Sequence, residues 1–224
     1  MTTRQEAIVS TLLSEYGSTY AQDAGITVRD KPAPLYRLLV LALLLSARIG
    51  SDIAVAGARE LFASGYRTPQ KMRDAGWKER VAALGRAHYR RYDERASTAL
   101  GNGATMLIDE YGGDLRKLRL ASTGREQMLG RLQEFPGIGP TGSSIFCREV
   151  QAVWPELAPF ADRKVQDGAE RLGLPGEAAK LGKFVESADM PRLAAGCVRA
   201  ALHEDVADAV LRPSGDSGTL VRGR

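Results

Sequence analysis

Hydrophobic and polar positions alternate with a helical period from one end of this chain to the other. Apolar residues recur at the three- and four-residue spacing of amphipathic helices, and no segment shows the strict alternation of a half-buried strand. The run 35–47 is apolar on nearly every side, which predicts a buried central helix. The pattern therefore predicts an all-α fold.

Prolines, glycines and capping residues set the expected helix boundaries. Thr123 and Glu126 have the spacing of a capping box, so a helix is expected to begin there. Pro69 is placed to open a short helix. The remaining predicted helices span 6–16, 51–62, 77–84, 89–111, 123–135, 141–153, 162–172, 176–188 and 191–209. Residues 212–224, rich in Gly, Ser and Arg, are expected to be disordered.

The charge balance is mildly basic. Lys and Arg number 31 against 27 Asp and Glu, a formal net charge of +4, which is compatible with a nucleic-acid partner without being diagnostic of one. Basic residues gather in the ranges 86–95 and 116–131. Each cluster could contact nucleic acid or form a solvated helix face, and the sequence leaves both open.

Two cysteines, Cys147 and Cys197, cannot supply the four thiolates of an iron–sulfur cluster. Both are expected to be buried free thiols in a reducing compartment. His88 and His203 have no metal-ligand spacing, so we expect neither a metal nor another cofactor. The N-terminus lacks a signal-peptide core and the apolar run 38–45 is too short for a bilayer. These features predict a soluble, cytoplasmic, nucleoid-associated protein with no membrane partner.

The most informative motif is Pro136-Gly137-Ile138-Gly139, between two predicted helices. The glycines permit a tight turn, and the free N–H groups at the start of the second helix can bind an anion such as a DNA phosphate. A lone carboxylate, Asp162, begins another helix 20 residues after Gly142. This acid could stabilise positive charge on a sugar, or it could be an ordinary N-cap, and the two roles are compatible.

These motifs resemble the helix-hairpin-helix DNA glycosylase superfamily, which includes endonuclease III and the adenine-mismatch and alkyladenine glycosylases. The resemblance extends from about 35 to 174: the segment 44–48 resembles the family's Leu-Leu-Ser-Ala-Gln, 132–139 its hairpin, and 160–165 its catalytic aspartate. It implies a two-lobed fold, with a six-helix bundle at 34–140 and a second lobe from 1–33 and 141–211. It also implies that double-stranded DNA lies across the cleft, with a damaged or mismatched nucleotide flipped toward Asp162.

The resemblance also implies roles for further residues, which are expectations at this point. Bifunctional members place a Schiff-base lysine where this chain has Thr141, so strand cleavage is not expected; Lys164 is the nearest other amine. Arg48 replaces a glutamine that fills the gap left by a flipped base, and it could equally be a helix C-terminal cation. A monovalent cation is expected on the hairpin carbonyls. The expected DNA-binding residues are Gly137, Ile138, Gly139, Thr141, Gly142, Arg48, Lys164 and Arg148, and Arg148 could instead face solvent.

The sequence thus favours a monomeric, monofunctional base-excision repair DNA glycosylase, an N-glycosyl hydrolase that uses Asp162. A non-catalytic protein that recognises lesions, junctions or abasic sites through the same hairpin is the main alternative. A helical protein–protein adaptor, in which 136–139 is only a turn, is a third. The sequence does not identify the base.

Overall fold

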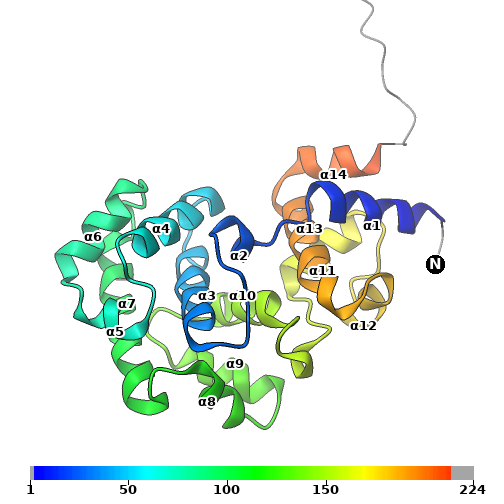
Figure 1. Ribbon diagram of the computed structural model, residues 1–224. Coiled ribbons are helices and arrows are strands. Elements are labelled where there is room, and N and C mark those ends of the chain that lie inside the picture. The colour runs from blue at the N-terminus through cyan, green and yellow to red at the C-terminus, as the bar shows by residue number, and fades with distance from the viewer. Residues whose placement is uncertain (1–2, 213–224) are drawn as a thin grey trace, which may run out of the picture.

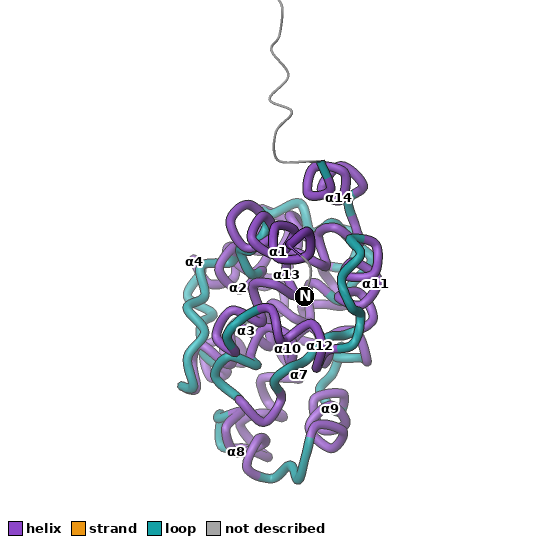
Figure 2. The backbone as a smooth tube through the Cα atoms, turned by 90° about the vertical axis from the view of Figure 1, so that its right-hand side faces the viewer, coloured by secondary structure: helices purple, strands orange, loops and turns teal. Residues whose placement is uncertain are grey.

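The computed structural model describes residues 3–212, which form two helical lobes (Figure 1). Within these residues the chain consists of α-helices, short 3-10 turns and loops, without a strand (Figure 2). The predicted all-α fold is confirmed. The sequence predicts disorder at 212–224, and residues 213–224 lie outside the described part of the chain. No helix in the described part is long and apolar enough to cross a membrane.

One lobe is built around α3, which is the buried central helix that the sequence predicts. Leu35, Leu38 and Leu41 of this helix are fully buried, and α3 packs against α4, α7, α8 and α10. The helices of this lobe are α3 (Pro32–Leu45), α4 (Ser51–Ala63), α5 (Pro69–Asp74), α6 (Trp77–Arg86), α7 (Asp93–Tyr111), α8 (Leu115–Leu120) and α9 (Arg125–Gln133).

The other lobe joins the two ends of the described chain. The N-terminal helix α1 lies beside α13 and α14 (Figure 1). Between the lobes runs α10, which contacts α3, α9 and α13. These helices are α1 (Thr3–Glu15), α2 (Tyr20–Asp23), α10 (Pro140–Val150), α11 (Arg163–Arg171), α12 (Ala178–Leu181), α13 (Met190–Leu202) and α14 (Glu204–Leu211), with 3-10 turns at Pro155–Leu157, Gly182–Phe184 and Ser187–Asp189. The lobe boundaries at 33/34 and 140/141 stay a prediction.

Residues 34–140, all of them described, contain one short helix that the sequence pattern does not predict, and the six-helix bundle expected over this range stays a prediction. The additional helix α8 is only six residues long, and Asp114 caps it by accepting from the N–H of Arg116. The predicted start of α7 at 89 is wrong, because His88 has a left-handed φ of 59° and the helix begins at Asp93. The predicted capping box at Thr123 is also wrong: Gly124 precedes α9, and the Thr123 N–H donates to the side chain of Gln127.

The C-terminal third is more broken than the periodicity predicts. The expected helix 176–188 consists of α12 and two 3-10 turns, and the expected helix 191–209 is interrupted at His203 between α13 and α14. Apolar residues recur at helical spacing across both breaks, so periodicity alone could not reveal them.

Helix α11 packs tightly on α13 through a glycine. A Cβ atom at Gly168 would overlap the backbone carbonyl of Cys197, so only glycine permits this approach. Cys197 and Cys147 are free and buried, as the sequence predicts. Burial raises the pKa of each thiol to about 12.

Candidate functional site

The hairpin between α9 and α10 is a tight turn held against the first lobe. Gly137 has a φ of 82°, and a Cβ there would lie 2.9 Å from that of Ala99 and 3.2 Å from Cδ1 of Leu43. Glycine is therefore required both by the backbone conformation and by the close approach. Ile138 is 4% exposed, and its N–H donates to the carbonyl of Phe135 at 2.9 Å.

Four amides of the hairpin make no hydrogen bond to the described residues. The N–H groups of Gly137, Gly139, Thr141 and Gly142 donate to no acceptor within residues 3–212, and the first backbone bond of α10 runs from the Ser143 N–H to the Gly139 carbonyl at 3.0 Å. Gly137 and Thr141 are exposed and Gly139 is half-buried, whereas Gly142 is buried. Free amides at the start of an 11-residue helix form an anion site, because the amides and the helix dipole point the same way.

Ile138 is an exception among the expected DNA-binding residues. Its amide is occupied and its side chain is buried, so it anchors the hairpin to the lobe and does not face a ligand. The carbonyls of Gly137 and Ile138 accept no hydrogen bond among the described residues, so they suit the expected monovalent cation, which stays a prediction. The described residues hold no group of three or more His, Cys, Asp or Glu placed to bind a metal.

Asp162 stands at the start of α11, as the sequence predicts, and both carboxylate oxygens have partners. Oδ1 accepts from the Val165 N–H at 3.0 Å, so the residue is an N-cap. Oδ2 pairs with Nη1 of Arg148 at 2.7 Å. The side chain of Asp162 keeps 11% of its exposure and that of Arg148 keeps 4%. The carboxylate is thus fixed in direction and only narrowly open to solvent.

Neither expectation for Arg148 agrees with this geometry. The side chain neither faces solvent nor reaches outward to a phosphate, because it is buried and forms an ion pair with Asp162. Its guanidinium lies 6.0 Å from the ring centre of Tyr20, and its Nε has no hydrogen-bond partner. Sequence spacing could not reveal this, since the partners are 14 positions apart across a loop.

A second buried carboxyl group, that of Glu149, adjoins Arg148. Its Oε2 accepts from the Ala21 N–H of α2 at 2.9 Å, while Oε1 has no partner. Burial raises the pKa of Glu149 above its ordinary value, and the positive charge of Arg148 opposes that shift. The sequence analysis missed Glu149, because a glutamate at helical spacing normally marks a solvated face.

Two other expected residues lie on the surface. The Lys164 side chain is 57% exposed, and its Nζ lies 3.6 Å from Asp167 of the same helix. Arg48 follows the end of α3 and is exposed, with no ion pair in the described part of the chain. It lines a groove of about 400 Å³ that also includes Gly137 of the hairpin. The structure thus brings Arg48 next to the hairpin.

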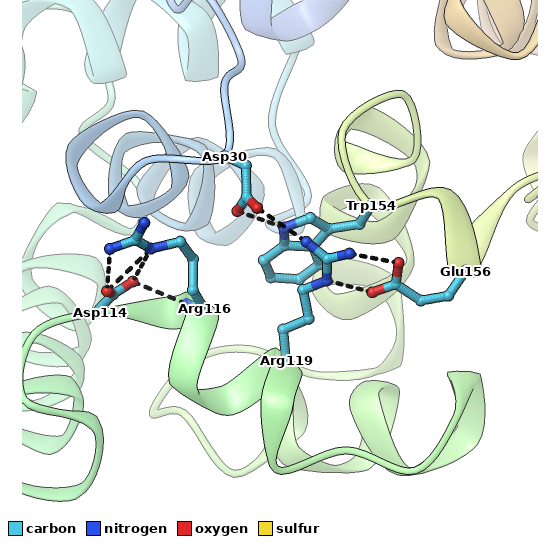
Figure 3. A network of polar contacts seen from close by, with 6 residues as sticks. All are labelled: Asp30, Asp114, Arg116, Arg119, Trp154 and Glu156. Atoms are coloured by element: carbon cyan, nitrogen blue, oxygen red, sulfur yellow. Dashed lines mark hydrogen bonds and ion pairs between the residues drawn. The ribbon is translucent and has the colours of Figure 1, made fainter.

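The basic cluster 116–131 is largely engaged in internal contacts. Figure 3 shows Arg119 between Asp30 and Glu156, with its guanidinium 5.4 Å from the ring centre of Trp154. Trp154 in turn donates to Asp30 at 3.0 Å. Two neighbours are also paired: Arg116 with Asp114, and Arg125 with the carbonyls of Leu157 and Pro159. Arg116 is thus paired within its own helix cap, while Arg119 and Arg125 bind the loop that follows α10, a role that neither interpretation of the sequence anticipates.

Comparisons with known proteins agree with the resemblance at the level of the fold. No family model matches the sequence, and a search of curated proteins finds no match. A solved non-covalent endonuclease III–DNA complex aligns over 89% of this chain and 86% of that chain, at 18% identity and a TM-score of 0.53. A trapped endonuclease III–DNA covalent intermediate with an estranged adenine aligns over the same shares, at 18% identity and a TM-score of 0.49. Similarity to the first complex shows that the chain has the all-helical fold of endonuclease III.

Proposed function

We propose that the protein is a monofunctional DNA glycosylase, which hydrolyses the bond between a damaged or mispaired base and its deoxyribose. The observation that carries the proposal is the hairpin: four amides of the turn and of the first residues of α10 have no acceptor within residues 3–212, in a chain with the endonuclease III fold. Such amides can hold a backbone phosphate without reading the sequence. A protein that searches DNA for rare lesions needs a contact of this kind.

Asp162 is the proposed catalytic residue. Breaking an N-glycosidic bond leaves positive charge on the sugar, and a carboxylate in a fixed place stabilises that charge or orients the attacking water. The N-cap bond to Val165 and the ion pair with Arg148 hold the carboxylate in one direction. Each oxygen can accept more than one hydrogen bond, so these two partners leave acceptor capacity for a water or a nucleotide.

Hydrolysis without strand cleavage follows from the side chains beside the hairpin. Thr141 has a hydroxyl where an imine-forming lysine would be needed. Lys164 is exposed and lies 3.6 Å from Asp167 on the surface of α11, so its amine is directed to a carboxylate of its own helix. The proposed reaction therefore ends at an abasic site.

The second candidate is a protein that binds damaged DNA without excising a base. The contacts of Asp162 favour it specifically: both oxygens already have partners and the side chain is only 11% exposed, which is what a residue acting as a cap and an ion-pair partner requires. In that case the hairpin would bind DNA and Asp162 would only hold α11 in place.

A lesion panel separates the two candidates. Duplexes that each carry one alkylated, deaminated, oxidised or mispaired base are incubated with the protein, and the released base is measured by chromatography. We expect release from at least one duplex and no product trapped by borohydride. Asp162→Asn, which keeps an N-cap oxygen but loses the charge, should abolish release.

Asp167→Asn is the matched control, because it removes a carboxylate of the same helix that pairs with Arg163 and Lys164 at the surface. It should excise like the wild type. Full activity in Asp162→Asn would refute the role of that residue. Tight binding to lesion duplexes without any released base would support the second candidate.

A further inference from the structure

The groove beside the hairpin is lined by Gly137 and by residues of α3, of α7 and of the segments next to these helices. It has a volume of about 400 Å³, and its polar rim includes Arg48, just after α3, and Arg95, in the first turn of α7. The rest of the lining is apolar or aromatic: Leu43, Ala47, Ala96, Ala99, Tyr89 and Tyr92, together with Ser46. The floor is rigid, because Tyr89 is buried and donates to the Leu44 carbonyl at 3.2 Å.

Positive charge in this groove is not compensated. Arg48 and Arg95 are its charged lining residues, no carboxylate lines it, and neither arginine has an ion-pair partner within residues 3–212. Several other surface arginines are paired with a carboxylate, among them Arg73 with Asp74, Arg86 with Glu60 and Arg163 with Asp167, but no carboxylate lines this groove. Two unpaired guanidinium groups across one depression favour an anionic ligand.

The same surface continues past the groove. Tyr92 and Arg95 also line an adjoining depression of about 630 Å³, which contains Arg90 and Arg91. Both of these arginines are exposed and lack an ion pair in the described chain, and the guanidinium of Arg91 lies 5.4 Å from the ring centre of Tyr92. We call Arg48, Arg90, Arg91 and Arg95 the arginine strip.

Two carboxylates, Asp93 and Glu94, also line this second depression. They occupy the first turn of α7, where the helix dipole stabilises negative charge, and Asp93 accepts from the Glu94 N–H at 2.8 Å. Four arginines against two carboxylates leave the strip with a net positive charge.

We propose that the arginine strip binds the DNA backbone next to the hairpin, so that consecutive phosphates pass from the hairpin amides to Arg48 and Arg95 and on to Arg90 and Arg91. Continuity carries this assignment: Gly137 belongs to the hairpin and to the groove, and Arg95 belongs to the groove and to the second depression. A separate small anion would need only one of these depressions. This inference rests on the proposed DNA binding and adds to it the path of one strand.

Salt dependence tests the path quantitatively. Each phosphate neutralised by a cation lowers the slope of log K against log salt by about 0.9 for duplex DNA. The variant Arg90→Gln/Arg91→Gln/Arg95→Gln should therefore reduce the magnitude of that slope by about 2.7, measured by fluorescence anisotropy with a 20-base-pair duplex. Its affinity should fall most at low salt.

The matched control is Arg73→Gln/Arg86→Gln/Arg116→Gln, which removes the same charge from exposed arginines that already have carboxylate partners. Its slope should stay within about 0.5 of the wild type, since it removes no phosphate contact. Equal losses in the two triple variants would overturn the inference, because binding would then follow net charge alone.

A hairpin variant separates this inference from the proposed function. Thr141→Glu places an acid in the first turn of α10, where it favours the helix but repels a phosphate. Weak binding in Thr141→Glu together with an unchanged slope in the strip variant would overturn the path and leave the hairpin as the DNA contact. A wild type that binds duplex DNA without any salt dependence would refute the proposed function itself.

Discussion

The ion pair between Arg148 and Asp162 makes a sharp prediction about stability. Replacing Arg148 by Met keeps the length and apolar stem of the side chain but leaves the Asp162 carboxylate without its guanidinium. Removing one partner of a buried pair costs about 3–5 kcal/mol, because the remaining charge is uncompensated. Asp162 keeps 11% exposure and its bond from the Val165 N–H, so we expect the lower end, about 3 kcal/mol.

Urea denaturation followed by circular dichroism measures this loss. About 3 kcal/mol lowers the folding equilibrium constant by roughly two orders of magnitude, and for a chain of this length lowers Tm by about 6–12 °C. The double variant Arg148→Met/Asp162→Asn should lose much less than the sum of the two single variants, because it leaves no buried charge unpaired.

The control is Arg163→Met, in α11, the helix that Asp162 caps. Its pair with Asp167 is exposed, with 79% of the Arg163 side chain accessible, so its loss should cost less than about 1 kcal/mol. A stability of Arg148→Met within about 1 kcal/mol of the wild type would refute the reasoning, as would a fully additive double variant.

Three further predictions concern the hairpin and the buried titratable groups. Gly137→Ala should destabilise the protein by about 2–4 kcal/mol in urea titrations, through its left-handed φ and the overlap with Ala99; an effect below about 1 kcal/mol would mean that the turn relaxes. Because the folded-state pKa of Glu149 is raised, its contribution to stability is present at acidic pH and is lost as pH rises through that value. Glu149→Gln should therefore gain stability over the wild type as pH rises above about 4.5, and a pH-independent difference would contradict this. Cys147 and Cys197, each with a pKa near 12, should react with a thiol reagent at pH 8 only after denaturant is added, and rapid labelling of the native protein would show that one of them is accessible.

The parts of the fold that could be predicted from sequence are those with local signals. The all-apolar run of α3, the glycine turn at 136–139 and the N-cap at Asp162 each depend on residues within a few positions of one another. The short helix α8 escaped prediction because a single capped turn of six residues gives no detectable period. The break at His203 escaped for the opposite reason, since apolar spacing continues across it.

The chemistry of the site depended on contacts that sequence spacing cannot show. From the sequence alone Arg148 is expected to be a surface cation. In the structure the loop after α10 places Asp162 next to it, and the two side chains form an ion pair. Likewise Arg119 and Arg95 look equivalent along the chain. The first finds a carboxylate 89 positions away, in Asp30, and the second finds none among the described residues. Which arginines remain unpaired is therefore decided by the tertiary structure.

Because Gly168 has no side chain, α11 can lie against α13, and this contact fixes the position of Asp162 at the start of α11. Helix α11 rests directly on the backbone of α13, so the start of α11 is positioned by a segment that lies some thirty residues further on in the sequence. A shortened protein that stops before α13 would retain the glycine turn and its amides but would lose the support beneath the acid. If the protein acts as proposed, truncation before α13 is expected to impair base excision more than DNA binding.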